Sequence, residues 1–130
     1  MQDLPPQQCI SRMLNQADRL GVEVRTMPQT TGQPAVGFYQ AAPGRPGRID
    51  LHTSDATPPI TLCRLLTHEM VHLLQHWKAG FNAVLPLGWP VDGEATKGRS
   101  LSPHEAEAFT AQEQPCKVLK ALNQLNPVSP

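Results

Sequence analysis

The chain has 130 residues and a mass of 14.2 kDa, which suffices for one domain with a modest hydrophobic core. Its 11 lysine and arginine residues balance 11 aspartate and glutamate residues, so the net charge is zero and the pI is near 7. A neutral chain lacks the excess of positive charge by which proteins bind nucleic acid or an anionic membrane surface. We therefore expect neither of them as a partner.

The N-terminal segment MQDLPPQQCISRML has neither the basic region nor the apolar region of a secretory signal. The longest apolar run, FNAVLPLGWPV at 81–91, is too short to cross a bilayer and is interrupted by proline and glycine. Cys9, Cys63 and Cys116 are far apart and form no C-x-x-C pair. An odd number of distant cysteines favours buried thiols in a reducing compartment. The sequence therefore predicts a soluble, cytoplasmic protein.

In chain order, the first expected element is a helix over residues 7–20, where apolar side chains recur at helical spacing until Gly21. Alternating apolar and polar residues then predict three strands near residues 22–27, 36–41 and 47–52. The turn between the second and third strands is rich in proline and glycine, so these two strands are expected to form a β-hairpin.

A long helix is expected from about residue 58 to residue 78. Thr57 is the candidate N-cap, and Pro58 suits the first turn because its missing N–H costs little there. Apolar residues within the helix recur with the spacing of a stripe that faces the core. This stripe consists of Leu66, Met70, Leu73 and Trp77.

Residues 79–101 are rich in glycine and proline and read as irregular. Within them, the apolar run 81–91 is expected to form an ordered loop, because its large side chains need burial or a ligand. A last helical region should start near Ser102, a candidate N-cap, and break at Pro115. The succession of a helix, three strands, a helix, a loop and C-terminal helices predicts one α+β domain over residues 1–130.

The stretch LLTHEMVHLLQHW at 65–77 places polar residues in an apolar run and contains the motif H-E-x-x-H. His68 and His72 lie one helical turn apart on the same face, so their imidazoles can bind one zinc ion together. Glu69 lies beside them and can take a proton from a zinc-bound water. Imidazoles and a carboxylate are costly among apolar neighbours unless they are paired or bind a metal. The stretch therefore predicts a zinc site with a catalytic base.

Two other histidines are not expected to bind this ion. His76 shares the face of His68 and His72, but eight helical residues rise about 12 Å, farther than one ion spans. We expect it to lie at the surface or to support the ligands. His52, at the end of a strand, is expected to be structural rather than to line a cleft, which is the alternative.

The third ligand must come from later in the chain, where Glu94, His104, Glu105 and Glu107 compete. Glu94 lies among glycines and polar residues in an expected loop, which is a poor rigid support. If the later segment is helical, Glu105 shares the more apolar face with Ala108, and this face should turn toward the long helix. We therefore expect Glu105 to bind the metal and Glu107 to face solvent or to support the site, with Glu94 and His104 as further alternatives.

The chain resembles a small gluzincin-type metallopeptidase, an HExxH zincin, and in particular the ImmA/IrrE family of intracellular regulatory peptidases. The similarity runs from GFYQ through RIDLH and LLTHEMVHLLQH to EAEAFTAQ, about residues 36–114. It implies a minimal zincin-like domain in which a small sheet packs on the helix that carries the motif.

The same resemblance assigns roles to individual residues. It implies His68, His72 and a later glutamate as zinc ligands and Glu69 as the catalytic base. The E-x-x-A pattern of the family matches Glu105 and Ala108. Two positions differ from the family pattern, because Val71 stands where the family carries glycine and Phe109 where it carries asparagine.

Two functions follow from these residues. The first is a zinc-dependent metallopeptidase that acts on a peptide or protein substrate, with Tyr39 or His104 as a candidate oxyanion stabiliser. The second is a non-catalytic, zinc-binding regulatory or protein-interaction domain on the same fold. A purely structural zinc usually has four protein ligands and no open position. The glutamate that follows the first histidine stands where a base is needed, so the enzyme is the expected function.

Overall fold

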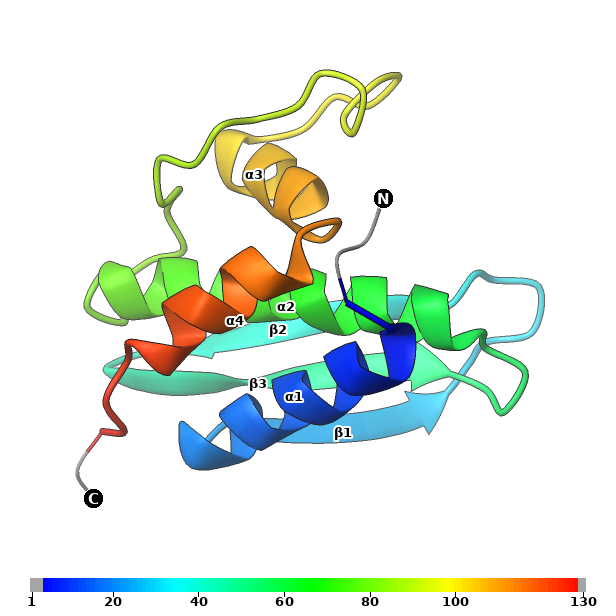
Figure 1. The fold of residues 1–130 in the computed structure, drawn as a ribbon, viewed down its shortest axis with the longest axis horizontal. Helices are drawn as coiled ribbons and strands as arrows, with labels where there is room; N and C mark the ends of the chain where they lie inside the picture. Colours follow the sequence, from blue (N-terminus) through cyan, green and yellow to red (C-terminus); the bar gives the residue numbers. More distant parts are fainter. Residues whose placement is uncertain (1–3, 129–130) are drawn as a thin grey trace.

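Four helices and a three-stranded sheet make up the part of the chain that the computed structural model describes, residues 4–128. Their order confirms the expected α+β layout (Figure 1). The elements are α1 (Pro6–Arg19), β1 (Glu23–Pro28), β2 (Val36–Ala42), β3 (Arg45–Thr53), α2 (Pro59–Lys78), α3 (Pro103–Ala111) and α4 (Pro115–Asn123).

The sheet has the strand order β1-β3-β2, so β3 lies in the middle. β2 and β3 form the expected antiparallel hairpin, whereas β1 pairs with β3 in parallel. The hairpin register shifts between Gln40 and Ala42. Gly47 lies opposite this irregularity, and a Cβ atom there would come within 2.0 Å of the backbone oxygen of Gln40. The close approach of the two strands therefore requires a glycine.

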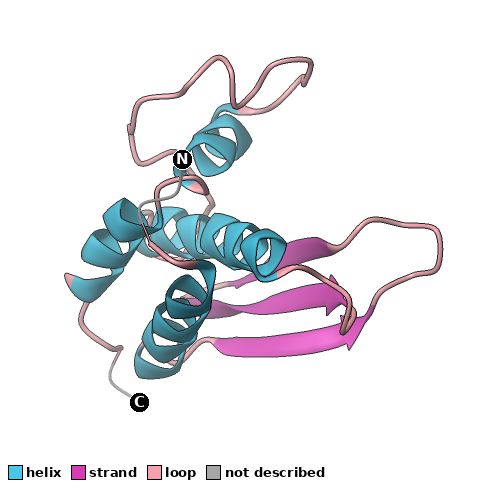
Figure 2. Cartoon of the chain, turned by 45° about the vertical axis from the view of Figure 1, so that its right-hand side comes forward, coloured by secondary structure: helices cyan, strands magenta, loops and turns pink. Residues whose placement is uncertain are grey.

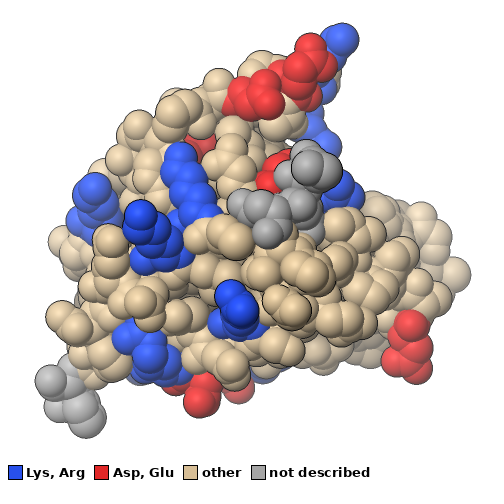
Figure 3. Space-filling view, in the orientation of Figure 1, with Lys and Arg blue, Asp and Glu red and all other residues tan. Residues whose placement is uncertain are grey.

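The helices cover one face of the sheet, as Figure 2 shows. α2 packs against β2 and β3, and it also contacts each of the other three helices. Leu66, Met70 and Leu73 are almost completely buried, as the apolar stripe predicts, and Trp77 is half-buried at the end of α2. α2 is therefore the central element of the core. Figure 3 shows lysine and arginine side chains at several separate places on one face of the molecule.

Cys9 of α1 and Cys63 of α2 form a disulfide, so the prediction of buried thiols is wrong for this pair. The two cysteines are 54 residues apart and become neighbours only because α1 packs along α2, with their Cα atoms 5.8 Å apart. Cys116 is exposed. Because disulfides persist mainly in oxidising compartments, the cysteines no longer support the expected cytoplasmic location. None of the helices within residues 4–128 is long and apolar enough to cross a membrane.

The two expected helix caps are wrong in their hydrogen bonds. α2 starts after Pro58 without a side-chain cap, and the hydroxyl of Thr57 instead accepts a bond from the backbone N–H of Ser54 at 3.1 Å. Ser102 occupies the N-cap position of α3, but its hydroxyl bonds with Nδ1 of His104 at 3.2 Å. Both helices have proline in the first turn, which removes an N–H group that would otherwise need a partner.

Candidate metal centre

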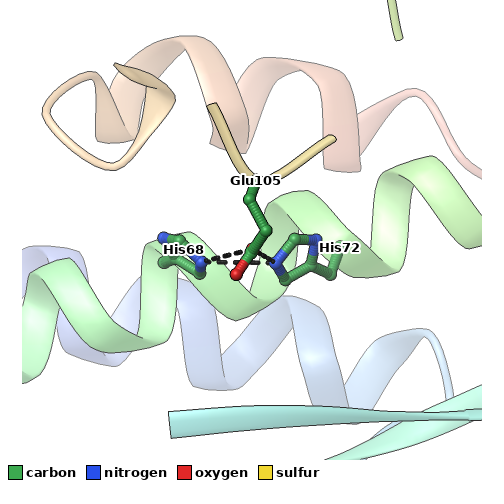
Figure 4. A group of neighbouring side chains, drawn as sticks. All are labelled: His68, His72 and Glu105. Atoms are coloured by element: carbon green, nitrogen blue, oxygen red, sulfur yellow. Dashed lines mark hydrogen bonds and ion pairs between the residues drawn. The ribbon is translucent and has the colours of Figure 1, made fainter. Parts of the chain in front are cut away.

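Three side chains from two helices converge between α2 and α3 (Figure 4). His68 and His72 extend from α2, and Glu105 extends from the first turn of α3. Nε2 of His72 lies 2.5 Å from Oε1 of Glu105, and Nε2 of His68 lies 3.2 Å from the same oxygen. The ligand atoms of the three residues lie within 4.8 Å of one another. This group could hold a metal ion, and it contains the two motif histidines and the expected third ligand.

Both histidines are oriented by glutamine side chains. Nδ1 of His72 donates to Oε1 of Gln75 at 2.7 Å, and Nδ1 of His68 donates to Oε1 of Gln112 at 2.9 Å. An acceptor at Nδ1 selects the tautomer whose Nε2 carries the free lone pair. Each Nε2 therefore faces Glu105 as a metal ligand requires. Sequence reasoning missed both glutamines, although Gln75 lies three residues after His72 on the same helical face.

Glu107 is almost completely buried, so it does not face solvent. One of its oxygens accepts hydrogen bonds from Nε2 of Gln75 at 2.9 Å and from the N–H of Leu87 at 2.7 Å. The other accepts from the N–H groups of Gly88 and Trp89 at 2.9 and 2.8 Å. Glu107 therefore has the second of its two expected roles, because it supports His72 through Gln75. It also fastens the loop that precedes α3.

Glu69, the candidate base, lies in the wall of the site with only 4% of its surface exposed. Gly37 of β2 makes room for it, because a Cβ atom at Gly37 would lie 3.1 Å from Cγ and 3.2 Å from Oε2 of Glu69. Burial raises the pKa of Glu69, and the nearby His68 and His72 oppose this rise. A carboxylate with a raised pKa is the stronger proton acceptor.

The charge state of Glu105 suits a metal ligand. Its hydrogen bonds with His68 and His72 hold the pKa of the carboxyl well below its usual range, so the group is ionised near neutral pH. Burial lowers the pKa of His72, but its hydrogen bonds with Glu105 and Gln75 outweigh burial and leave this pKa raised. In these hydrogen bonds Nε2 of each imidazole carries a proton, and a metal ion would take the place of that proton and leave the neutral ligand form.

The metal-ligand group, which consists of His68, His72 and Glu105, opens onto a cavity of about 730 Å³ between β2, α2 and α3. Glu69 lines the same cavity. The side chain of Glu105 is 36% exposed, whereas those of His68 and His72 are 10% exposed, so the accessible side of the group is that of Glu105. Three ligands beside an accessible position are typical of catalytic rather than structural zinc sites. The volume is within the usual range for ligand cavities, about 300–1,000 Å³.

His76 lies outside the metal-ligand group, as its distance along the helix predicts, but it is buried and not at the surface. Its Nδ1 lies 2.6 Å from the hydroxyl of Tyr39, which also accepts a hydrogen bond from the N–H of Gly47 at 2.8 Å. Burial lowers the pKa of His76 and raises the pKa of Tyr39 to about 12. The Tyr39 hydroxyl therefore donates to a neutral His76.

The remaining candidates occupy different places. Tyr39 and His104 both line the cavity, but the hydroxyl of Tyr39 is engaged with His76 and Gly47, whereas the ring of His104 lies 5.7 Å from the ring of His72. His104 is thus the better placed of the two expected oxyanion stabilisers. Glu94 is exposed in the loop and belongs neither to the metal-ligand group nor to the cavity lining. His52 packs edge-to-face on Phe38, in keeping with a structural role.

The apolar run 81–91 lies partly in the core and partly at the cavity. Leu87 and Trp89 pack against the core, and Lys117 of α4 lies 4.6 Å from the centre of the Trp89 ring. Val84 lines the cavity, whereas Leu85 is exposed. The large side chains of this loop therefore serve mainly as packing, and one smaller residue reaches the candidate site.

Comparison with known proteins adds no relative to this picture. No family model matches the chain, and neither a curated protein nor a solved structure matches it. The function therefore has to be inferred from the geometry of the candidate site.

Proposed function

We propose that the protein is a zinc-dependent metallopeptidase of the HExxH type. One observation carries the proposal: His68, His72 and Glu105 form a group of metal ligands that opens onto a cavity, and buried Glu69 lines that cavity beside them. The combination of three ligands, a base and an accessible space is what metal-assisted hydrolysis of a peptide bond needs.

The donor set fits zinc. Two neutral imidazole nitrogens and one ionised carboxylate oxygen are ligands that zinc binds at catalytic sites, and they leave a position for water or substrate. His68, His72 and Glu105 would hold the ion, while Gln112 and Gln75 orient the two imidazoles. When bound, zinc acidifies a water molecule and polarises the scissile carbonyl group.

Glu69 performs the proton transfers in this proposal. Its carboxylate accepts the proton of the attacking water and later gives it to the nitrogen of the leaving amine. Its burial raises its pKa, which favours accepting a proton, and Gly37 leaves room for its side chain against β2. The ring of His104 lines the cavity and is the candidate donor to the carbonyl oxygen.

The substrate in this proposal is an extended peptide. β2 is an edge strand, because only β3 pairs with it, and residues 36–39 of β2 line the cavity. A peptide that adds to this edge by backbone hydrogen bonds would cross the cavity beside the metal ligands. Membership of the ImmA/IrrE family is part of the same proposal, and the motif residues in α2 together with Glu105 and Ala108 support it.

Metal analysis of the purified protein, combined with digestion of a peptide library, tests the proposal. We expect about one zinc ion per chain and cleavage that a chelator stops and added zinc restores. Bound zinc without cleavage would favour the non-catalytic zinc-binding domain. A protein that neither contains zinc nor takes it up would contradict both functions.

A further inference from the structure

The cavity beside the metal ligands contains two arginines that differ in their partners. Arg64 of α2 forms an ion pair with Glu113, whose two carboxylate oxygens lie 2.9 and 3.1 Å from its Nε. Arg99 lies in the loop before α3, with its guanidinium 4.2 Å from the centre of the Phe109 ring. Both arginines line the cavity. Only the charge of Arg64 is therefore compensated by a neighbouring carboxylate.

Arg99 keeps its charge and its donors available. No carboxylate within residues 4–128 lies within 4.0 Å of its guanidinium, and its side chain makes no hydrogen bond there. Attraction to the face of an aromatic ring positions a cation without neutralising it and uses none of its five N–H groups. Phe109 thus holds a planar donor group at the cavity wall with its hydrogen-bonding capacity unused.

The position of Arg99 relates it to the reaction centre. The ring of Phe109 is packed edge-to-face against the metal ligand His68, with the ring centres 4.6 Å apart. Arg99, Phe109 and His68 therefore form a continuous row from the loop to the metal-ligand group. A molecule in this cavity can therefore contact Arg99 and the metal ligands together, because both line it.

We infer that Arg99 binds a carboxylate of the substrate, so that the preferred peptide carries a negative charge close to the bond that is cleaved. This inference rests on the proposed function and specifies its substrate class. A guanidinium binds a carboxylate through two parallel hydrogen bonds, which gives orientation as well as affinity. The carboxylate is either an acidic side chain or the C-terminus of the peptide, and the two sources share this chemistry.

Binding of matched peptides to the zinc-loaded full chain tests the inference, with Glu69→Gln present throughout so that no peptide is consumed. The probes are acetyl-Phe-Glu-Phe-amide, its isosteric glutamine counterpart, and the glutamine peptide with a free C-terminus. Phenylalanine suits the apolar part of the cavity, which includes Phe38 and Leu65. We expect at least one of the two carboxylate peptides to bind about tenfold more tightly than the neutral one. The peptide that shows the preference identifies the source of the carboxylate.

Three variants assign the preference to Arg99. Arg99→Gln should abolish it, and Arg99→Lys should retain only part of it because lysine lacks the planar fork. Lys97→Gln is the matched control, because Lys97 is an exposed cation of the same loop that does not line the cavity. This control should leave the preference unchanged. The melting temperature of Arg99→Gln should fall by at most a few degrees, because Arg99 is exposed and loses only its contact with the Phe109 ring among residues 4–128.

The possible results separate this inference from the proposed function. Equal binding of all three peptides, binding of none, or a preference that persists in Arg99→Gln would overturn the role of Arg99. In the last case the carboxylate binds elsewhere, for example at the metal. If the protein with Glu69 intact cleaves peptides without a preference for charge, only the inference about Arg99 fails. An Arg99-dependent preference without any cleavage would contradict the peptidase and leave the carboxylate site standing.

Discussion

The two helices that form the candidate metal centre are held by different forces. α2 has 20 residues, and each residue from 66 to 76 is buried among the sheet and the other helices. α3 has nine residues. It contributes the small side chains Ala108 and Ala111 to the core, and polar contacts also join it to its surroundings. These contacts run from Glu107 to Gln75 and to the backbone of the preceding loop.

The two helices therefore position their site residues in different ways. The core presets the positions of His68, Glu69 and His72, because moving them would require the packing of α2 to change. Glu105 is placed by a short helix whose position depends on two small core residues and on a few buried hydrogen bonds. Substitutions of these three residues of α2 should therefore change catalysis or metal binding. Substitutions in α3 should change both metal binding and the stability of the fold.

The largest effect is expected at the base on α2. Glu69→Gln should lower peptide turnover about 10²–10⁴-fold, because the amide keeps the shape of the side chain but cannot accept the proton. Zinc content should remain at the parent level, since Glu69 is not one of the metal-ligand group. Steady-state kinetics and metal analysis of the same preparation give both values. Full activity would remove Glu69 from the mechanism.

The next effect distinguishes the two carboxylates of α3. Glu105→Ala removes a ligand atom and should weaken zinc binding more than the ~10–100-fold typical of a supporting residue. Glu107→Ala leaves three backbone N–H groups without their acceptor and removes one of the two acceptors of the Gln75 amide. Each unsatisfied donor costs up to about 1–3 kcal/mol, so this variant should lose more stability.

Zinc titration and thermal denaturation of the two variants, measured side by side, give the comparison. The α3 assignment is contradicted if Glu107→Ala alone loses the metal. It is also contradicted if Glu105→Ala alone lowers the melting temperature of the metal-free protein.

A smaller effect is expected at the glutamines that orient the histidines. Gln75→Leu should weaken zinc binding about tenfold or more, because His72 loses the acceptor that orients its ring. Gln112→Leu, at the C-cap of α3, is the matched variant and should have a smaller effect, since Gln112 is half-buried and water can replace it. Zinc competition with a chromophoric chelator measures both affinities. Equal losses of zinc affinity in the two variants would mean that the greater burial of Gln75 does not make it the stronger support.

The same contrast explains which parts of the site the sequence predicts. His68, Glu69 and His72 lie within five residues of one helix, so local spacing determines their relative positions. Glu105 was predicted from the apolar face of a second helix, and its small neighbour Ala108 is fully buried. Glu107, Thr110 and Ala111 on the opposite face are buried as well, so the prediction of a single covered face is wrong. Interactions that depend on packing between distant segments left no comparable signal.

Two of the missed features show this limit. The Cys9–Cys63 disulfide joins residues 54 apart, and only the packing of α1 on α2 makes them neighbours. The role of Glu107 depends on the N–H groups of a loop about twenty residues earlier, whose backbone direction no local pattern reveals. The strands were predicted within two residues because alternation of apolar and polar side chains is a local signal. Their order in the sheet is not local.

The smallest effect is expected in the apolar run 81–91, whose backbone is hydrogen-bonded to Glu107. Two substitutions compare its core-facing side with its cavity-facing side. Trp89 packs against the core beneath Lys117 and does not line the cavity, whereas Val84 lines the cavity. Trp89→Ala should lower the free energy of unfolding by ~1.5–2.5 kcal/mol, half the cost of truncating a fully buried tryptophan, and change turnover little. Val84→Ala should raise the KM of an apolar peptide severalfold with little change in stability, because it removes contact area from the cavity wall alone. Thermal denaturation and steady-state kinetics on both variants decide between packing and substrate binding. If Trp89→Ala reduces turnover more than it reduces stability, the tryptophan contacts the substrate and the loop moves during the reaction.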